Sequence, residues 1–148
     1  MEYTVGQMAK LLGVAPSTLR YYDKQGLLPS LARSEGGVRA FGDRDYETLK
    51  LIQCLKRAGM SLADIRRFID MTAQGDSTID QRLALFYRQR EAVQQQMAHL
   101  QQTLAVIEYK CWYYETAKAA GTTAALAGVE IPPQFRQVWQ QLHQPEEP

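Results

Sequence analysis

No glycine or proline interrupts the chain between Gly75 and Gly121, and this long segment carries one regular apolar repeat. Apolar or aromatic residues recur there at alternating spacings of four and three, with Arg90 as the one exception. The repeat positions are Ile79, Leu83, Phe86, Arg90, Val93, Met97, Leu100, Leu104, Ile107, Cys111 and Tyr114. Such a repeat predicts a single helix, about 55 Å long at a rise of about 1.5 Å per residue, with an apolar seam along one side.

Polar residues border this seam, among them Gln94, Gln95, Gln96, Gln101 and Gln102. A long helix that packs on its own domain is the alternative, but such a helix has a wider apolar face. We therefore expect a second copy of the chain to cover the seam, in an antiparallel coiled coil over residues 76–116. The expected central contacts are Leu83, Phe86, Val93, Met97, Leu100, Leu104 and Ile107.

Two short helices are predicted near the start of the chain. Thr4 and Gln7 form a Thr-x-x-Gln capping box, and the helical apolar spacing that follows ends at Gly13. Pro16 suits the first position of the next helix, because its missing N–H would have no helical partner there. This second helix should end near Gln25. Two helices joined by so short a turn are typical of a helix-turn-helix.

An arginine-bearing hairpin is predicted over residues 31–41. The pair Gly36-Gly37 suits a tight turn, and the short strands on either side carry Arg33 and Arg39. Next to a helix-turn-helix, a basic hairpin indicates the wing of a winged DNA-binding domain.

Two more helices are predicted between the hairpin and the long helix. The third covers Asp43–Ala58, and the fourth follows a Ser61 cap and ends before Gly75. Thr78 and Gln81 then repeat the capping-box pattern at the start of the long helix.

The predicted fold class is all-α with a small β-hairpin wing. We expect a winged helix-turn-helix domain over residues 1–75, the dimerisation helix over 76–116 and a short tail over 117–148. The tail should contain a small helix over Gln134–His143, and residues 145–148 are expected to be disordered.

The net charge of +1 hides an uneven distribution. Residues 1–70 hold 11 Lys and Arg against 8 Asp and Glu, whereas residues 71–148 hold 6 against 8. Because duplex affinity depends on local neutralisation of phosphates, a positive amino-terminal part favours DNA as the partner of that part.

Four polar side chains of the second helix fall at i, i+3, i+4 and i+7, and so share one face: Ser17, Arg20, Tyr21 and Lys24. Leu19 and Tyr22 point the other way, toward the first helix. The alternative reading is an ordinary solvated helix face. Beside an arginine-bearing hairpin, we interpret this face as a reader of phosphates and base edges.

These motifs together resemble the amino-terminal signature of the MerR family, over residues 3–71. The matching segments are Thr4-Val5-Gly6-Gln7-Met8-Ala9, Thr18-Leu19-Arg20-Tyr21-Tyr22-Asp23, Gly26-Leu27-Leu28 and Gly37-Val38-Arg39. The resemblance implies a homodimer that binds a palindromic operator within an overlong promoter spacer and distorts the DNA for RNA polymerase. Together with the polar face of the second helix, the resemblance predicts a set of DNA contacts: Ser17, Thr18, Arg20, Tyr21, Lys24, Arg33, Arg39 and Lys56.

The effector is predicted from the cysteines. Metal-sensing relatives carry a cysteine at the start of the dimer helix, whereas this helix opens with Ser77-Thr78-Ile79, so we expect neither a metal nor a cofactor. Cys54 resembles the single thiol of the branch that senses aldehydes, nitric oxide or other electrophiles. We expect it at a packed helix junction, where Lys56 and Arg57 would favour the reactive thiolate, and a plain packing role is the alternative.

Other functions remain as alternatives. Aromatic residues around Cys111 and Tyr114 would line a small-molecule pocket or pack against the tail, with tail packing favoured. A coiled-coil protein that binds proteins and not DNA is the runner-up from another class. No catalytic motif is visible, so no enzyme is expected. Without a signal peptide or an apolar run long enough for a bilayer, we expect a cytoplasmic protein that does not enter membranes.

Overall fold

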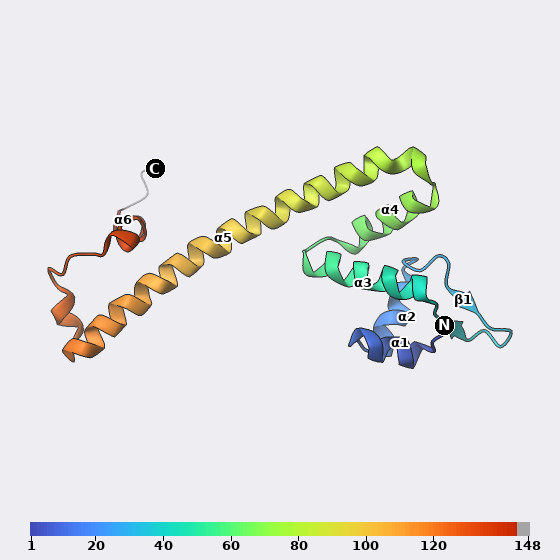
Figure 1. The fold of residues 1–148 in the computed structure, drawn as a ribbon, viewed down its shortest axis with the longest axis horizontal. Coiled ribbons are helices and arrows are strands. Elements are labelled where there is room, and N and C mark those ends of the chain that lie inside the picture. Colours follow the sequence, from blue (N-terminus) through green and yellow to red (C-terminus); the bar gives the residue numbers. More distant parts are fainter. Residues whose placement is uncertain (145–148) are drawn as a thin grey trace. The chain divides into compact units, whose positions relative to one another are not determined.

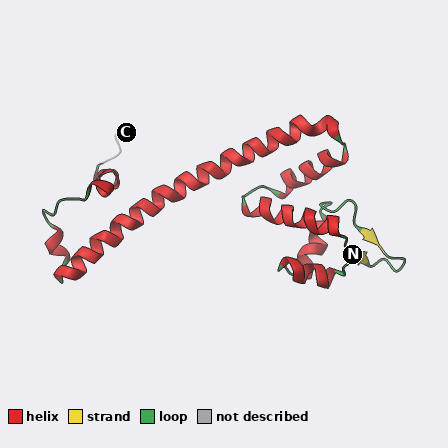
Figure 2. Cartoon of the chain, viewed as in Figure 1, coloured by secondary structure: helices red, strands yellow, loops and turns green. Residues whose placement is uncertain are grey.

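The computed structural model describes residues 1–144, so the expected disorder of residues 145–148 lies outside the described residues. The described chain is mostly helical, with one two-stranded hairpin (Figure 2), and this confirms the predicted fold class. Six α-helices and two strands occur in the order α1 Val5–Leu12, α2 Pro16–Lys24, β1 Ala32–Arg33, β2 Arg39–Ala40, α3 Asp43–Arg57, α4 Leu62–Ala73, α5 Ile79–Ala120 and α6 Arg136–His143 (Figure 1). Single 3₁₀ turns lie at Asp76–Thr78, Thr123–Leu126 and Pro133–Phe135.

The chain divides into two compact units, and the boundary falls inside α5. The first unit is Met1–Val93, and the second begins at Gln94. The continuous helix α5 therefore belongs to both units.

Helix α1 is capped at both ends. The Thr4 hydroxyl accepts from the N–H of Gln7 at 3.3 Å, and the Gln7 side chain accepts from the N–H of Thr4 at 2.8 Å, as the capping box predicts. At the other end Gly13 has a φ of 66°, and the Gln53 amide of α3 donates to the carbonyl of Leu12 at 3.0 Å. Helix α3 thus holds the end of α1.

The core of the first unit draws on each of its helices. Seven large side chains are almost fully buried: Met8, Leu19, Leu27, Phe41, Leu49, Ile52 and Ile65. Burial of one such side chain stabilises the fold by roughly 1.5–3 kcal/mol. Leu85 of α5 is buried in the same cluster, so the start of α5 is part of this core.

The hairpin forms where the sequence predicts it, around Gly36 and Gly37. Strands β1 and β2 pair antiparallel, with Arg33 opposite Arg39. The N–H of Gly37 donates to the carbonyl of Ser34, and Gly37 has a φ of 75°, whereas Gly36 does not have a positive φ. Of the pair Gly36-Gly37, only Gly37 occupies the left-handed position, at the end of a three-residue loop between Ser34 and Val38.

The base of the hairpin is tied to the start of the chain. Tyr3 and Phe41 exchange two backbone hydrogen bonds of 2.8 and 2.9 Å, and the side chain of Phe41 is fully buried. The wing is therefore anchored at the end of β2 and free at its tip.

The capping box predicted at Thr78 is wrong. Thr78 is buried in a 3₁₀ turn, and its hydroxyl lies 2.6 Å from the carbonyl oxygen of Met71 and 2.9 Å from that of Gly75. The hydroxyl therefore donates toward the end of α4, and within the described residues it does not accept the N–H of Gln81 that a capping box requires. The cap predicted at Ser61 is confirmed by its bond from the N–H of Asp64, 3.1 Å long.

In the second unit the tail folds back on the end of α5. The ring of Phe135 lies 6.0 Å from that of Tyr109 and 5.8 Å from that of Trp112. Val138 of α6 is buried, as is Tyr109. The aromatic residues near the end of α5 thus pack against the tail, as predicted.

Candidate nucleic-acid interface

The face of α2 that the sequence proposes as a reader is open to solvent. Ser17, Arg20, Tyr21 and Lys24 are all exposed, while Leu19 and Tyr22 are buried against the core. Thr18, the other expected contact in this helix, is half-buried. Because α1 packs against α2, and Leu19 and Tyr22 are buried in the core, the polar face of α2 has a fixed orientation relative to the domain.

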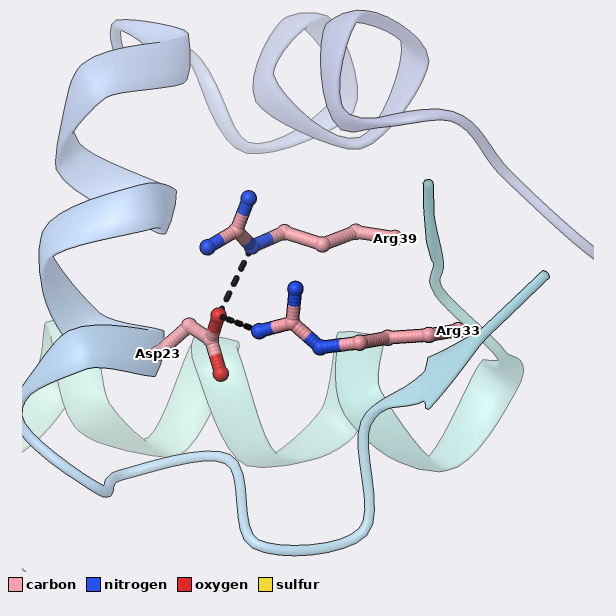
Figure 3. Close-up of polar contacts among 3 residues, drawn as sticks. All are labelled: Asp23, Arg33 and Arg39. Atoms are coloured by element: carbon pink, nitrogen blue, oxygen red, sulfur yellow. Dashed lines mark hydrogen bonds and ion pairs between the residues drawn. The ribbon is translucent and has the colours of Figure 1, made fainter. Parts of the chain in front are cut away.

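Both wing arginines point at α2, and both bind the same carboxylate oxygen (Figure 3). Oδ2 of Asp23 accepts from Nε of Arg39 at 2.7 Å and from a terminal nitrogen of Arg33 at 2.9 Å. The side chain of Asp23 is 15% exposed and that of Arg39 is 27% exposed, so this contact is partly shielded from water. The wing is thereby linked to the helix that carries the reading face.

The contact of Asp23 with the wing was not predicted from the sequence. From the sequence, Arg33 and Arg39 were predicted as DNA contacts, without a partner within the chain. The sequence does mark Asp23 as unusual, because it is the one acidic residue of α2 and lies between Arg20 and Lys24. Its contact with a hairpin ten and sixteen residues later depends on tertiary structure.

Lys56 is the expected DNA contact that lies outside α2 and the hairpin. It is exposed in the last turn of α3, and its ammonium lies 5.5 Å from the ring centre of Tyr22. Such a cation–π contact places the charge of α3 beside α2. The expected cations Arg20, Lys24 and Lys56 thus come from two adjoining helices.

Two family models match this chain. The model of the MerR HTH family regulatory protein matches residues 3–72, and the model described as MerR, DNA binding, matches residues 46–109. An HTH-type transcriptional regulator of Haemophilus influenzae is 47% identical over 132 residues, which are 89% of this chain and 98% of that protein. This chain belongs to the MerR family.

Solved structures of MerR-family proteins are similar over most of the chain. One is HiNmlR, described as a MerR family regulator lacking the sensor domain and bound to promoter DNA. It is 48% identical, with a TM-score of 0.76, and the match covers 84% of this chain and 99% of that one. A MerR-family transcriptional regulator from Bacillus thuringiensis is 43% identical, with a TM-score of 0.68 and coverage of 75% and 97%.

The family assignment makes this chain a DNA-binding transcriptional regulator, as the resemblance of its motifs implied. The relatives described above are transcriptional regulators and not enzymes. Within residues 1–144, none of the helices has both the length and the apolar character needed to cross a membrane.

In this MerR-family regulator the seam of α5 is largely uncovered within one chain. Among the seven expected central contacts, the exposed fractions run from 47% at Leu83 to 66% at Leu100, and Met97, Leu104 and Ile107 are also exposed. Val93 is half-buried. Phe86 differs from the rest, because it packs on the core of its own domain and offers only part of its surface to a partner.

The thiol of Cys54 does not lie where we expected it. Its side chain is exposed on α3 and not enclosed in a junction between helices, so a purely buried packing role does not fit. Lys50 at i−4 and Arg57 at i+3 share its side of the helix. The ammonium of Lys50 lies 5.2 Å from the ring centre of Tyr46, and that of Lys56 is directed to Tyr22. Cys111 is also exposed.

Proposed function

We propose that this MerR-family regulator binds a palindromic operator as a homodimer, with α2 in the major groove and the wing against the phosphate backbone. The observation that carries the proposal is the exposed polar face of α2, with the arginines of the wing held at the same helix. Arg20 is the expected base reader, and Ser17, Tyr21 and Lys24 are suited to phosphate or base contacts.

The apolar seam of α5 supports the homodimer. Leu83, Met97, Leu100, Leu104 and Ile107 form a stripe of exposed apolar side chains at heptad spacing. Exposed contiguous apolar surface of this kind marks an interaction site, and a heptad stripe fits another helix of the same kind. We propose an antiparallel pairing of two copies of α5. A two-fold symmetric protein matches the two halves of a palindrome.

Regulation is proposed to work through the shape of the promoter. The dimer would bind between the two promoter elements and distort an overlong spacer so that RNA polymerase engages both elements. The likeness to a relative bound to promoter DNA supports this site of action. Such a regulator acts in the cytoplasm and performs no reaction on a substrate.

For the signal, we propose an electrophile that reacts with the thiol of Cys54. The exposure of Cys54 gives a reagent direct access, and Arg57 lies at i+3 on the same side of α3. A small-molecule pocket among the aromatic residues is less well supported, because Phe135 already packs on Tyr109 and Trp112.

The test is a selection of duplexes from a random-sequence library with the full chain, followed by footprinting on the enriched duplex. We expect a palindrome with half-sites one helical turn apart, or a multiple of that spacing. In transcription assays, the regulator should activate a promoter with an overlong spacer that contains this palindrome, and not one with a spacer of ordinary length. A chain that enriches no sequence would be a coiled-coil protein of another function.

A further inference from the structure

We propose that Asp23 is a positioning residue for DNA binding, which holds the guanidinium groups of Arg33 and Arg39 in the orientation that meets the operator backbone. The proposal rests on the proposed function, in which α2 and the wing contact one duplex. Asp23 is acidic and would not itself bind phosphate, so its effect passes through the two arginines.

The strand register shows why the wing needs a carboxylate at this place. Arg33 and Arg39 are direct partners across β1 and β2, so their side chains leave the same face of the hairpin. Two like charges in this position repel each other and destabilise the strand pair. Oδ2 of Asp23 lies within 2.9 Å of a nitrogen of each arginine, so one negative charge contacts both positive charges.

The contact leaves most of the arginine donors free. A guanidinium has about five N–H donors in a fixed plane, and the contact with Asp23 uses a single nitrogen of each arginine. Figure 3 shows the contact of Arg39 ending at Nε, with one terminal nitrogen directed away from the carboxylate. Binding through Nε therefore restricts the orientation of the group and leaves terminal N–H donors available for a phosphate.

Charge counting and positioning make opposite predictions for the loss of Asp23. If only net charge mattered, removal of a carboxylate beside the DNA surface would strengthen binding to any duplex. If Asp23 positions the arginines, its removal leaves two facing cations without a common partner, and their side chains spread over many conformations. Ordering them again on the operator would cost conformational entropy, so operator binding would weaken.

The experiment measures binding of the full chain to the duplex enriched by selection and to a scrambled duplex of the same length, over a range of salt concentrations. For Asp23→Asn we expect a loss of at least tenfold in operator affinity, with unchanged or stronger binding to the scrambled duplex. The slope of log affinity against log salt should become shallower by about 1 or more, since fewer phosphates are neutralised. Operator affinity at or above that of the wild type, with the same slope, would overturn the proposal.

A double-mutant cycle tests whether the effect passes through the wing. In an Arg33→Gln/Arg39→Gln background, Asp23→Asn should change operator affinity by less than about twofold, because the groups that it positions are gone. A full tenfold loss in that background would assign Asp23 a different role. Asp23→Glu keeps the carboxylate and should bind the operator more tightly than Asp23→Asn, and equal losses would count against the proposal. If the wild-type chain does not prefer the operator to the scrambled duplex, the proposed function itself fails, which is a separate result.

Discussion

The ring of Phe86 on α5 meets the ring of Phe68 on α4 edge to face, with centroids 5.1 Å apart and planes at 84°. This geometry suits the quadrupoles of two aromatic rings. Close by, the Gln89 amide of α5 donates to the carbonyl of Ala58 at 2.7 Å, just after the end of α3. The first turns of α5 are therefore fixed to the DNA-reading domain by apolar and polar contacts, while the seam continues beyond them.

Phe86→Ala should therefore loosen the attachment of α5 to α4. A fully buried phenylalanine costs about 3–5 kcal/mol when cut to alanine, and because Phe86 is half-buried we expect about 2 kcal/mol. Chemical denaturation followed by circular dichroism measures this loss. Phe86→Leu is the matched control, since it keeps apolar volume, and should cost less than the alanine variant. Equal stability of Phe86→Ala and the wild type would show that the ring contact does not hold α5.

Arg20→Ala should abolish specific operator binding without unfolding the dimer. The lost contact of an arginine with a guanine is worth roughly 1–3 kcal/mol for each subunit, and the complex contains two. Binding titrations at one salt concentration measure the effect. Arg136→Ala removes an equal charge from the tail, where the arginine pairs with Glu130, and should leave operator affinity unchanged. If the two variants bind the operator equally well, Arg20 is not a reader.

Replacement of Leu100 and Leu104 by Asp should convert the dimer to a monomer. Both residues are exposed in one chain, and in the proposed coiled coil the new carboxylates would be buried without a cation to offset them. Sedimentation velocity measures the assembly state. The matched control is Gln95→Asp/Gln102→Asp, which adds the same charges on the opposite side of the helix and should remain a dimer. A dimer formed by the Leu100/Leu104 variant would exclude the seam as the interface.

Gly37→Ala should destabilise the wing, whereas Gly36→Ala should not. Gly37 has a φ of 75°, which costs an alanine about 1 kcal/mol, while Gly36 lies outside the left-handed region and has open space around a new Cβ. Amide hydrogen exchange of the hairpin measures local stability. The Gly37 variant should exchange faster between Ala32 and Ala40. Equal exchange in the two variants would contradict the three-residue loop.

Cys54→Ser should abolish the response to an electrophile, and Cys111→Ser should not. Both thiols are exposed, so Cys111→Ser controls for a general effect of thiol loss. The measurement is promoter activity in wild type and both variants after addition of an aldehyde or a nitrosating agent. Full induction of the Cys54→Ser variant would remove the thiol from signalling.

Local patterns along the chain were sufficient to predict most of the secondary structure. The capping box of Thr4, the proline at the start of α2 and the 4-3 repeat of α5 are formed by neighbours in sequence, and each predicted its helix correctly. The capping-box pattern did not predict the start of α5 correctly, because the hydroxyl of Thr78 is turned toward the carbonyls of Met71 and Gly75. A capping pattern in the sequence therefore predicts a cap only where tertiary contacts do not turn the capping side chain away from the helix.

The sequence by itself determined the helical fold, the basic hairpin, the apolar seam and the family to which they belong, because these depend on spacing along the chain. Only the tertiary structure decided which groups meet. It brought Asp23 to Arg33 and Arg39, placed Phe86 against Phe68 and left Cys54 exposed. Helix periodicity assigns a side chain to a face, but the partner of that face depends on how the core packs the helices together.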